Sequence, residues 1–395
     1  MDMRTLVEDG DDTIDIGLQP LESPYELERI WTDLERRADG SFFLSWHWIG
    51  NWLASLPRGA RPHALVARHD GRVVGLALLC PRTQWRFGLL RTRCWLLHET
   101  GDRVFDRLFV EYNGILADRS CANAVLAACF DWLGLRLTNW DELVLAGLEP
   151  GAEAAVRRAA ARQGHTLQVR LADRCQWVDL EGVRRQGNGY LASLGKNTRS
   201  AVRRAMRLYA ERGPLTYRVA ATVEQALDDF RAMEVLHQAS WSARGRSGAF
   251  SNPAFRPFHE RLIATGVPAG TVRLCRVRAG NGTIGYLYNF VHRGRVMNYQ
   301  GGFAYETDNR LKPGLVSHVL AIEDTLARGE RCYDFMSTPG GHKPLLSNAE
   351  QPMNWIALGP DRLSRQIDTR LRRVKAGLAA RLKRLARSPL PLMNR

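Results

Sequence analysis

Residues 296–343 contain the stretch that most restricts what this chain can fold into. Residues 296–300 and 332–336 have the apolar and aromatic character of strands, and between them Lys312-Pro313-Gly314 opens a segment of helical periodicity that stops at Gly329. Proline near the first turn and glycine just past the last are the expected ends of a helix. The backbone N–H groups at such a helix start have no partner within the helix, so they can hold an anion. The stretch therefore predicts a strand, a helix with an anion-binding start, and a second strand.

The two halves of the chain show the same order of signals. In each half a long helix leads to a loop with phenylalanine, a short helix and two strands joined by a tight turn, Asp70-Gly71 or Asn281-Gly282. The repeat unit is roughly 170 residues, which is too long for a solenoid and suits two copies of one α/β domain. A chance match is the alternative, because helix-to-hairpin orders are common. We expect an α/β (α+β) fold of two tandem domains, each with a mixed, mostly antiparallel sheet flanked by helices.

The expected organisation has five parts. An acidic N-terminus without fixed structure covers residues 1–18, the first domain 19–181, a linker 182–189, the second domain 190–361, and a basic amphipathic tail 362–395. Periodicity predicts helices at 24–38, 120–135, 151–163, 190–212, 222–241 and from 253. It predicts strands at 63–68, 72–80, 93–98, 107–116, 142–146, 166–172, 216–220, 272–277 and 284–291.

Composition excludes several classes of protein. The acidic N-terminus has the wrong charge for a secretory signal, and the apolar runs are too short to span a membrane. The seven cysteines are scattered and none has zinc spacing, so we expect reduced thiols in a cytosolic protein that uses no metal. Of the net charge of +15, residues 362–395 carry +10, from eleven basic side chains and one acidic. The other 361 residues have 45 basic and 40 acidic side chains, or +5, so the body is only mildly basic.

The run 280–285, Gly-Asn-Gly-Thr-Ile-Gly, matches the G-x-G-x-x-G pattern of dinucleotide-binding loops. That interpretation requires a helix directly afterwards, whereas a β-branched and aromatic strand follows here. We therefore interpret the run as a hairpin turn and exclude NAD binding.

Two groups of residues near the end of the second half are candidates for chemistry. Asp334 ends a strand and could orient or deprotonate a nucleophile, and Lys343 follows a glycine loop and could bind an anionic group. The alternative is an aspartate that caps a turn and a solvent-exposed lysine. Lys312 and Gly314, with Asn309 and Leu315 beside them, are the candidates for holding a phosphate, unless this is an ordinary helix start.

Two further segments have open interpretations. Residues 193–207 form a basic helix face with Arg199, Arg203 and Arg207, which suits either an anionic partner or a solvated surface. His237, Trp241 and Arg244 end a helix and could line an acceptor pocket, although Trp241 could equally belong to the core.

The tail has leucine, isoleucine and valine at spacings of three and four with basic residues between them: Leu363, Ile367, Leu371, Val374, Leu378, Leu382 and Leu385. Such a basic amphipathic helix can lie on an anionic membrane, pack on the body or pair with a partner helix. The sequence leaves these three alternatives open.

Taken together, these residues resemble the CelD-like acetyltransferases of cellulose and exopolysaccharide gene sets, which are related to the FemAB peptidyltransferases and are paired GNAT folds. The resemblance covers roughly residues 40–360 and is carried by 193–207, 237–241, 286–299, Pro313-Gly314 and Tyr333-Asp334-Phe335 with Lys343. The sequence departs from the usual pattern of that family at two points. Ser337-Thr338-Pro339 lengthens the glycine loop, and His342 takes the place of a tyrosine.

The resemblance implies an acyltransferase that uses an acyl-coenzyme A as co-substrate and needs no metal. Lys312, Gly314 and Leu315 would contribute to its phosphate site, and only the second half would bind donor, because the first lacks a Pro-Gly helix start. Asp334, Tyr299 or His342 would position or deprotonate the acceptor, and Lys343 would neutralise charge.

The implied acceptor is a sugar or lipid-linked precursor of a surface polysaccharide, and the implied location is cytoplasmic, with peripheral contact at the inner face of the cell membrane. Two alternatives keep the fold. One is a transferase that takes an aminoacyl-tRNA as donor, with 193–207 and the tail on RNA phosphates. The other is a non-catalytic scaffold that recruits polysaccharide enzymes to the membrane through its tail.

Overall fold

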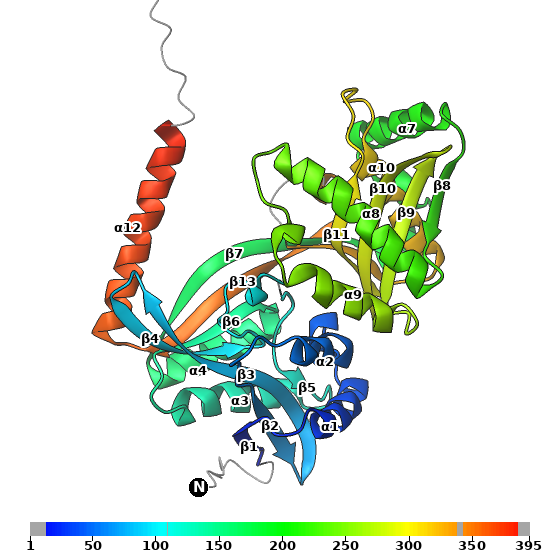
Figure 1. Ribbon diagram of the computed structural model, residues 1–395. Helices are drawn as coiled ribbons and strands as arrows, with labels where there is room; N and C mark the ends of the chain where they lie inside the picture. The colour runs from blue at the N-terminus through cyan, green and yellow to red at the C-terminus, as the bar shows by residue number, and fades with distance from the viewer. Residues whose placement is uncertain (1–12, 109, 338–342, 386–395) are drawn as a thin grey trace, which may run out of the picture.

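The computed structural model describes residues 13–108, 110–337 and 343–385 (Figure 1). In these residues one mixed sheet of thirteen strands is flanked by helices. The strands are β1 (Asp15–Pro20), β2 (His63–His69), β3 (Arg72–Arg86), β4 (Leu90–Leu97), β5 (Leu116–Ala117), β6 (Glu142–Leu148), β7 (His165–Asp179), β8 (Leu215–Val219), β9 (Val272–Ala279), β10 (Gly282–His292), β11 (Arg295–Phe303), β12 (Cys332–Ser337) and β13 (Ala349–Pro360).

The helices lie on both faces of this sheet. They are α1 (Pro24–Arg37), α2 (Trp46–Ala54), α3 (Ala122–Arg136), α4 (Pro150–Gln163), α5 (Leu180–Gln186), α6 (Tyr190–Ser193), α7 (Lys196–Ala210), α8 (Val223–Ser242), α9 (Phe255–Gly266), α10 (Pro313–Ala327), α11 (Lys343–Leu346) and α12 (Leu363–Leu385). Short 3₁₀ turns lie at Phe42–Leu44, Phe105–Leu108 and Ala249–Ser251. Among the described helices, none is both long enough and apolar enough to cross a membrane.

The order of strands repeats between the halves. In the first half, β1 to β4 pair antiparallel in succession and β4 then pairs parallel with β6. In the second half, β8 to β11 pair antiparallel and β11 then pairs parallel with β12. The expected fold class, two tandem α/β units of one topology, is confirmed.

The halves exchange their last strands at the centre of the sheet. The order β6-β13-β7-β12 places β13, from the end of the chain, between two strands of the first half, and β7 between two strands of the second. β7 and β13 pair along most of their length, from Ala349 opposite Trp177 to Pro360 opposite His165. Figure 1 shows the two strands as a long curved ribbon that joins the halves. Neither half can therefore complete its sheet without the other.

Local chemistry explains where these elements begin and end. Ser23 caps α1, because its Oγ accepts the Glu26 N–H at 3.2 Å. The β2–β3 turn places Asp70 and Gly71 at φ 48° and 74°, the left-handed backbone that the Asp-Gly signal predicts.

The core also crosses between the halves. Phe42 from the first half stacks on Phe290 from the second with ring centroids 4.3 Å apart, and Trp48 meets Phe258 at 5.0 Å. All four side chains are buried. Such large aromatic contacts tie the two units into one hydrophobic core.

Four local expectations are wrong. The described residues from 107 to 115 form a loop with the end of a 3₁₀ turn rather than a strand, β5 begins only at Leu116, and α5 occupies most of the expected linker. The basic helix expected at 190–212 is broken into α6 and α7. β1 begins at Asp15, within the segment expected to lack structure, because its backbone pairs with β2. Residues 1–12 lie outside the described residues.

Candidate active site

The strands β11 and β12 separate after a short parallel pairing. Residues 295–297 pair with 332–334. Beyond them β11 stays paired with β10 as far as Phe303, whereas β12 is irregular between Asp334 and Ser337, where Met336 has a left-handed φ of 59°. The backbones of the two strands therefore diverge between residues 298–303 and 335–337, and this place of divergence is called the split from here on.

Helix α10 begins beside the split and covers it. The ring of His318, in the second turn, lies 5.6 Å from the ring of Phe303 on β11 and 5.2 Å from that of Phe335 on β12. Its Nδ1 is 3.1 Å from the Tyr333 hydroxyl. One face of the helix thus contacts both strands at the point where they have parted.

The predicted phosphate-binding residues lie at the start of this helix. Lys312 is the residue before α10 and is half-buried, Gly314 is buried and Asn309 is exposed. Within the described residues no side chain caps this start. The N–H groups of Gly314 and Leu315 lie in the first turn and have no carbonyl partner within the helix, so they remain available to an anion.

Asp334 is sealed at the bottom of the split. Its carboxylate accepts hydrogen bonds from the Tyr112 hydroxyl at 2.6 Å and from the backbone N–H of Met336 at 2.7 Å, and it pairs with Arg295 at 3.3 Å. The side chain is fully buried. Because all these partners are protein groups, Asp334 is placed to fix the irregular end of β12 rather than to touch an acceptor directly.

Glu111 and Lys343 lie on the other side of the same strand end. The Glu111 carboxylate accepts the Ser337 N–H at 2.8 Å, and burial raises its pKa to about 8, although that hydrogen bond and the charge of Lys343 favour the ionised form. Lys343 donates to the carbonyls of Phe335 at 2.5 Å and Met336 at 3.4 Å. Burial lowers the pKa of Lys343, and the charges of Glu111 and Asp334 oppose that effect.

The other predicted site residues surround the far end of β11. Tyr299 donates its hydroxyl to the Leu108 carbonyl. On the face opposite α10, Nδ1 of His237 contacts the Gly301 carbonyl at 3.1 Å and its Nε2 accepts the Ala249 N–H at 3.2 Å, so both ring nitrogens already have backbone partners. Trp241 is half-buried beside His237, and Arg244 is exposed over the ring of Tyr305. His342 lies outside the described residues.

The equivalent opening in the first half is filled. β4 and β6 also separate after three parallel pairs. There Asn113 bridges the gap, because its N–H donates to the Gly147 carbonyl at 2.9 Å and its Nδ2 donates to the Leu97 carbonyl at 3.1 Å. Gly147 has φ 55°, close to the value for Met336 at the matching bend of the second half. The repeat has thus kept the bend in both halves, while an inserted loop occupies the first opening.

Three residues of the site were not predicted from the sequence. Glu111 and Tyr112 come from the loop that fills the first half, and Arg295 begins β11. Residues 107–116 read as a strand by composition, so no local signal marks Glu111 and Tyr112 as site residues. The only sequence pattern that pointed to this place was the Asp334-Phe335 strand end, because Glu111, Tyr112 and Arg295 all contact the end of β12.

Comparisons with known proteins agree with this geometry. Residues 196–344 match the family model described as an acetyltransferase (GNAT) domain, which spans the split and α10. The match supports a GNAT acetyltransferase domain in the second half of the chain, and with it the general class of acyltransferases. No protein in the curated set compared with this chain matches its sequence.

One of the similar solved structures shares its fold with most of this chain. FemX is similar with a TM-score of 0.54 at 10% identity over 85% of this chain and 96% of that chain. L-PGS from Bacillus licheniformis gives 0.48 at 11% identity over 91% and 96%. A tandem GNAT protein from the clavulanic acid biosynthesis pathway gives 0.42 at 15% identity over 88% and 100%. At these identities the likeness to FemX shows a shared fold and nothing about substrates.

Proposed function

We propose that this chain transfers an acyl group from an acyl-coenzyme A to an amine or hydroxyl, with the donor in the split of the second half. The observation that carries the proposal is that β11 and β12 diverge next to the second turn of α10, a helix whose start has no side-chain cap among the described residues. An extended thioester arm would lie along β11, because among the described residues the pairing of β11 with β12 stops at Met297 while β11 itself continues to Phe303. The match of residues 196–344 to a GNAT acetyltransferase domain supports the same class of reaction.

The start of α10 would hold the pyrophosphate of the donor. The N–H groups of Gly314 and Leu315 would donate to phosphate oxygens, Lys312 would supply positive charge, and Asn309 would contact the nucleotide from the exposed loop. Backbone N–H groups of residues 298–303 would bind the carbonyl oxygen as negative charge develops on it.

On the acceptor side we take Glu111 rather than Asp334 as the proton acceptor, because the Glu111 carboxylate accepts one backbone hydrogen bond whereas that of Asp334 has three partners. A carboxylate with a pKa of about 8 is better matched to an amine or hydroxyl than an ordinary one. In the reaction the acceptor atom would attack the thioester carbon, Glu111 would take the acceptor proton, and the coenzyme A thiolate would leave and be protonated. Asp334, Tyr112 and Lys343 would be positioning residues that hold the end of β12, and Tyr299 would line the acceptor side.

The acceptor class rests on the sequence resemblance. We propose a sugar or lipid-linked precursor of a surface polysaccharide, reached from the α8 face past Trp241 and Arg244. The resemblance to the FemAB peptidyltransferases keeps an aminoacyl-tRNA donor as the second candidate.

Calorimetric titration with acetyl-coenzyme A and with a longer acyl-coenzyme A tests the donor assignment. We expect binding of at least one of them, and Lys312→Ala should weaken it about tenfold through loss of a charged phosphate contact. Lys375→Ala, in the distant helix α12, is the matched control and should bind as the wild type does. Absence of binding to both donors, together with RNA that co-purifies at moderate salt, would replace this proposal with the aminoacyl-tRNA alternative.

A further inference from the structure

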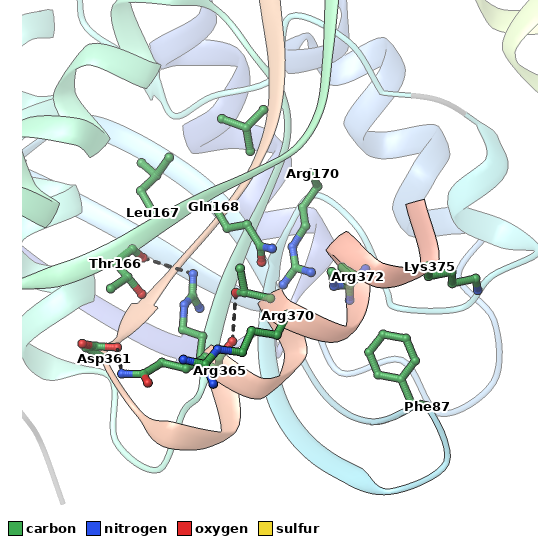
Figure 2. Close-up of a pocket in the computed structure, with 13 residues that line it drawn as sticks. Phe87, Thr166, Leu167, Gln168, Arg170, Asp361, Arg365, Arg370, Arg372 and Lys375 are labelled. Carbon is green, nitrogen blue, oxygen red and sulfur yellow. Dashed lines mark hydrogen bonds between the residues drawn. The ribbon is translucent and has the colours of Figure 1, made fainter. Parts of the chain in front are cut away.

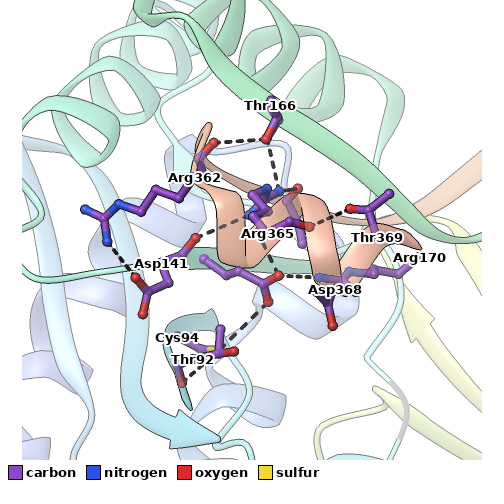
Figure 3. Close-up of polar contacts among 12 residues, drawn as sticks. Thr92, Cys94, Asp141, Thr166, Arg170, Arg362, Arg365, Asp368 and Thr369 are labelled. Atoms are coloured by element: carbon purple, nitrogen blue, oxygen red, sulfur yellow. Dashed lines mark hydrogen bonds and ion pairs between the residues drawn. The ribbon is translucent and has the colours of Figure 1, made fainter. Parts of the chain in front are cut away.

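Helix α12 is attached to the body by its polar side. Arg365 donates to the carbonyls of Ala357 at 2.5 Å and Thr166 at 3.1 Å, and Asp368 pairs with Arg170 of β7 at 3.0 Å (Figure 3). Arg365 and Asp368 are only 6% and 3% exposed. The buried face of this helix is thus made of ion pairs and hydrogen bonds, the reverse of an ordinary surface helix.

The apolar side of α12 faces away from the body. Ile367, Leu371, Val374 and Leu378 fall within about 60° of the helix circumference at 100° per residue. All four are exposed, Val374 by 60% and Leu378 by 56%. Figure 1 shows the helix projecting from the end of the sheet, with no other element along its outer part. A contiguous apolar stripe of this kind marks an interaction surface.

Charge determines which partner suits the stripe. From residue 369 to the end of the chain there are nine basic side chains and no acidic one. Two copies of such a helix would repel each other, whereas an anionic surface would attract it. Arg370 and Lys375 are exposed beside the stripe and line a cavity of about 1060 Å³ between α12 and β7, whose described lining includes five basic residues and one acidic (Figure 2).

The neighbouring β3–β4 hairpin adds aromatic side chains. Trp85, Phe87 and Leu89 are exposed at its tip, and the guanidinium of Arg372 lies 6.0 Å from the centre of the Phe87 ring. Aromatic and aliphatic side chains among basic ones are the composition that proteins use at the boundary between lipid headgroups and acyl chains.

We propose that α12 and the tip of the β3–β4 hairpin form a docking surface for an anionic lipid bilayer. The apolar stripe would enter the headgroup boundary, and Arg370 and Lys375 would contact anionic headgroups. The proposal stands on α12 and the hairpin alone and does not depend on acyl transfer at the split.

Co-sedimentation of the full chain with vesicles tests this docking surface. We expect binding to vesicles that contain phosphatidylglycerol, much weaker binding to pure phosphatidylcholine, and a decrease with salt. Val374→Ser combined with Leu378→Ser should weaken binding about tenfold or more, because two apolar side chains leave the bilayer boundary. Arg370→Glu combined with Lys375→Glu should remove the preference for anionic lipid.

Val235→Ser combined with Leu135→Ser is the matched control, because these exposed side chains lie on α8 and α3. It should bind vesicles as the wild type does, and circular dichroism should show equal helicity in all variants. Failure of the wild type to bind anionic vesicles would overturn the proposal. So would an equal loss in the control, or a concentration-dependent dimer that the Val374 and Leu378 changes abolish, which would assign the stripe to a second copy.

Discussion

At the scale of the residue, Glu111 carries the chemistry of the proposed site. It is buried against the end of β12, accepts one backbone hydrogen bond and faces the charge of Lys343. Burial penalises the ionised form more than these two groups favour it, so the pKa lies near 8 rather than at its usual value. At pH 7 only about one carboxyl in ten would then be ionised and able to accept a proton.

The rate of thioester turnover should follow this ionisation. A base must be ionised to act, so we expect kcat to rise with pH up to about 8, the pKa of Glu111, and to level off above it. Glu111→Gln should lower kcat by at least about a hundredfold and remove this rise, with the donor Kd unchanged. Release of the coenzyme A thiol, with water as acceptor, measures the rate without knowledge of the natural acceptor.

Glu28→Gln, at an exposed position of α1, is the control for the loss of a carboxylate and should behave as the wild type. A Glu111→Gln variant that keeps the wild-type kcat and pH profile would remove Glu111 from the mechanism.

Sequence reasoning reached the site only in part. The Asp-Phe strand end and the Pro-Gly helix start are local patterns, and the structure places Asp334 and Lys343 at one strand end and Lys312 at the helix start beside the split. Glu111 lies on a loop more than 200 positions away in sequence from Ser337, the residue that it contacts. No local sequence pattern around Glu111 indicates that contact. His237 was predicted for an acceptor pocket because it ends a helix, yet it is held by backbone groups on both ring nitrogens.

At the scale of the element, the place where β4 and β6 diverge differs from the equivalent place where β11 and β12 diverge. Asn113 joins β4 to β6 in the first half, whereas in the described part of the second half β11 and β12 pair at residues 295–297 and 332–334 and then diverge. The start of α3 also lacks the proline of α10. Both halves therefore keep the bend in the strand, but in the first half a loop bridges the diverging strands.

Donor binding should therefore show a stoichiometry of one per chain. Calorimetric titration with the acyl-coenzyme A that binds measures this number directly, because the first opening is already occupied by protein backbone. Lys312→Ala should weaken that single site and reveal no second one. A stoichiometry of two, or a site of full affinity that remains in the variant, would contradict the assignment of donor binding to the second half.

Most elements could be predicted from the sequence, because caps, tight turns and periodicity act over a few residues. The helices α3, α4, α8 and α10 lie close to the expected ranges, and so do both hairpins. The strand expected at 107–116 failed because its apolar residues serve the junction between the halves rather than a sheet face. The sequence could not show which way the apolar face of α12 points, since the helix is oriented by ion pairs with β6 and β7 and by a hydrogen bond to β13, strands far away in sequence.

At the scale of the whole molecule, β7 and β13 make the two halves interdependent. Each lies between strands of the other half, and the aromatic core around Phe42 and Phe290 crosses the same junction. No periodicity or turn signal could have predicted this exchange, because the hydrogen bonds join strands far apart in sequence.

Unfolding should accordingly be one cooperative event. Tryptophan fluorescence and far-ultraviolet circular dichroism should give coincident denaturant transitions, although most tryptophans lie in the first half. A fragment of residues 13–186 should fail to give a cooperative transition alone, because β6 and β7 lose β13 between them. Two separate transitions, or a stably folded fragment, would show that the halves are independent.

The exchange of β7 and β13 also sets the order of events during synthesis. The first half leaves the ribosome with β6 and β7 complete, but their common partner β13 begins about 170 residues later, a delay of about 9–34 s at ordinary elongation rates. Throughout that interval both strands present open hydrogen-bonding edges, the feature that invites aggregation. The nascent chain is therefore expected to depend on chaperones, and a ribosome that stops before residue 349 releases a product that cannot close its own sheet.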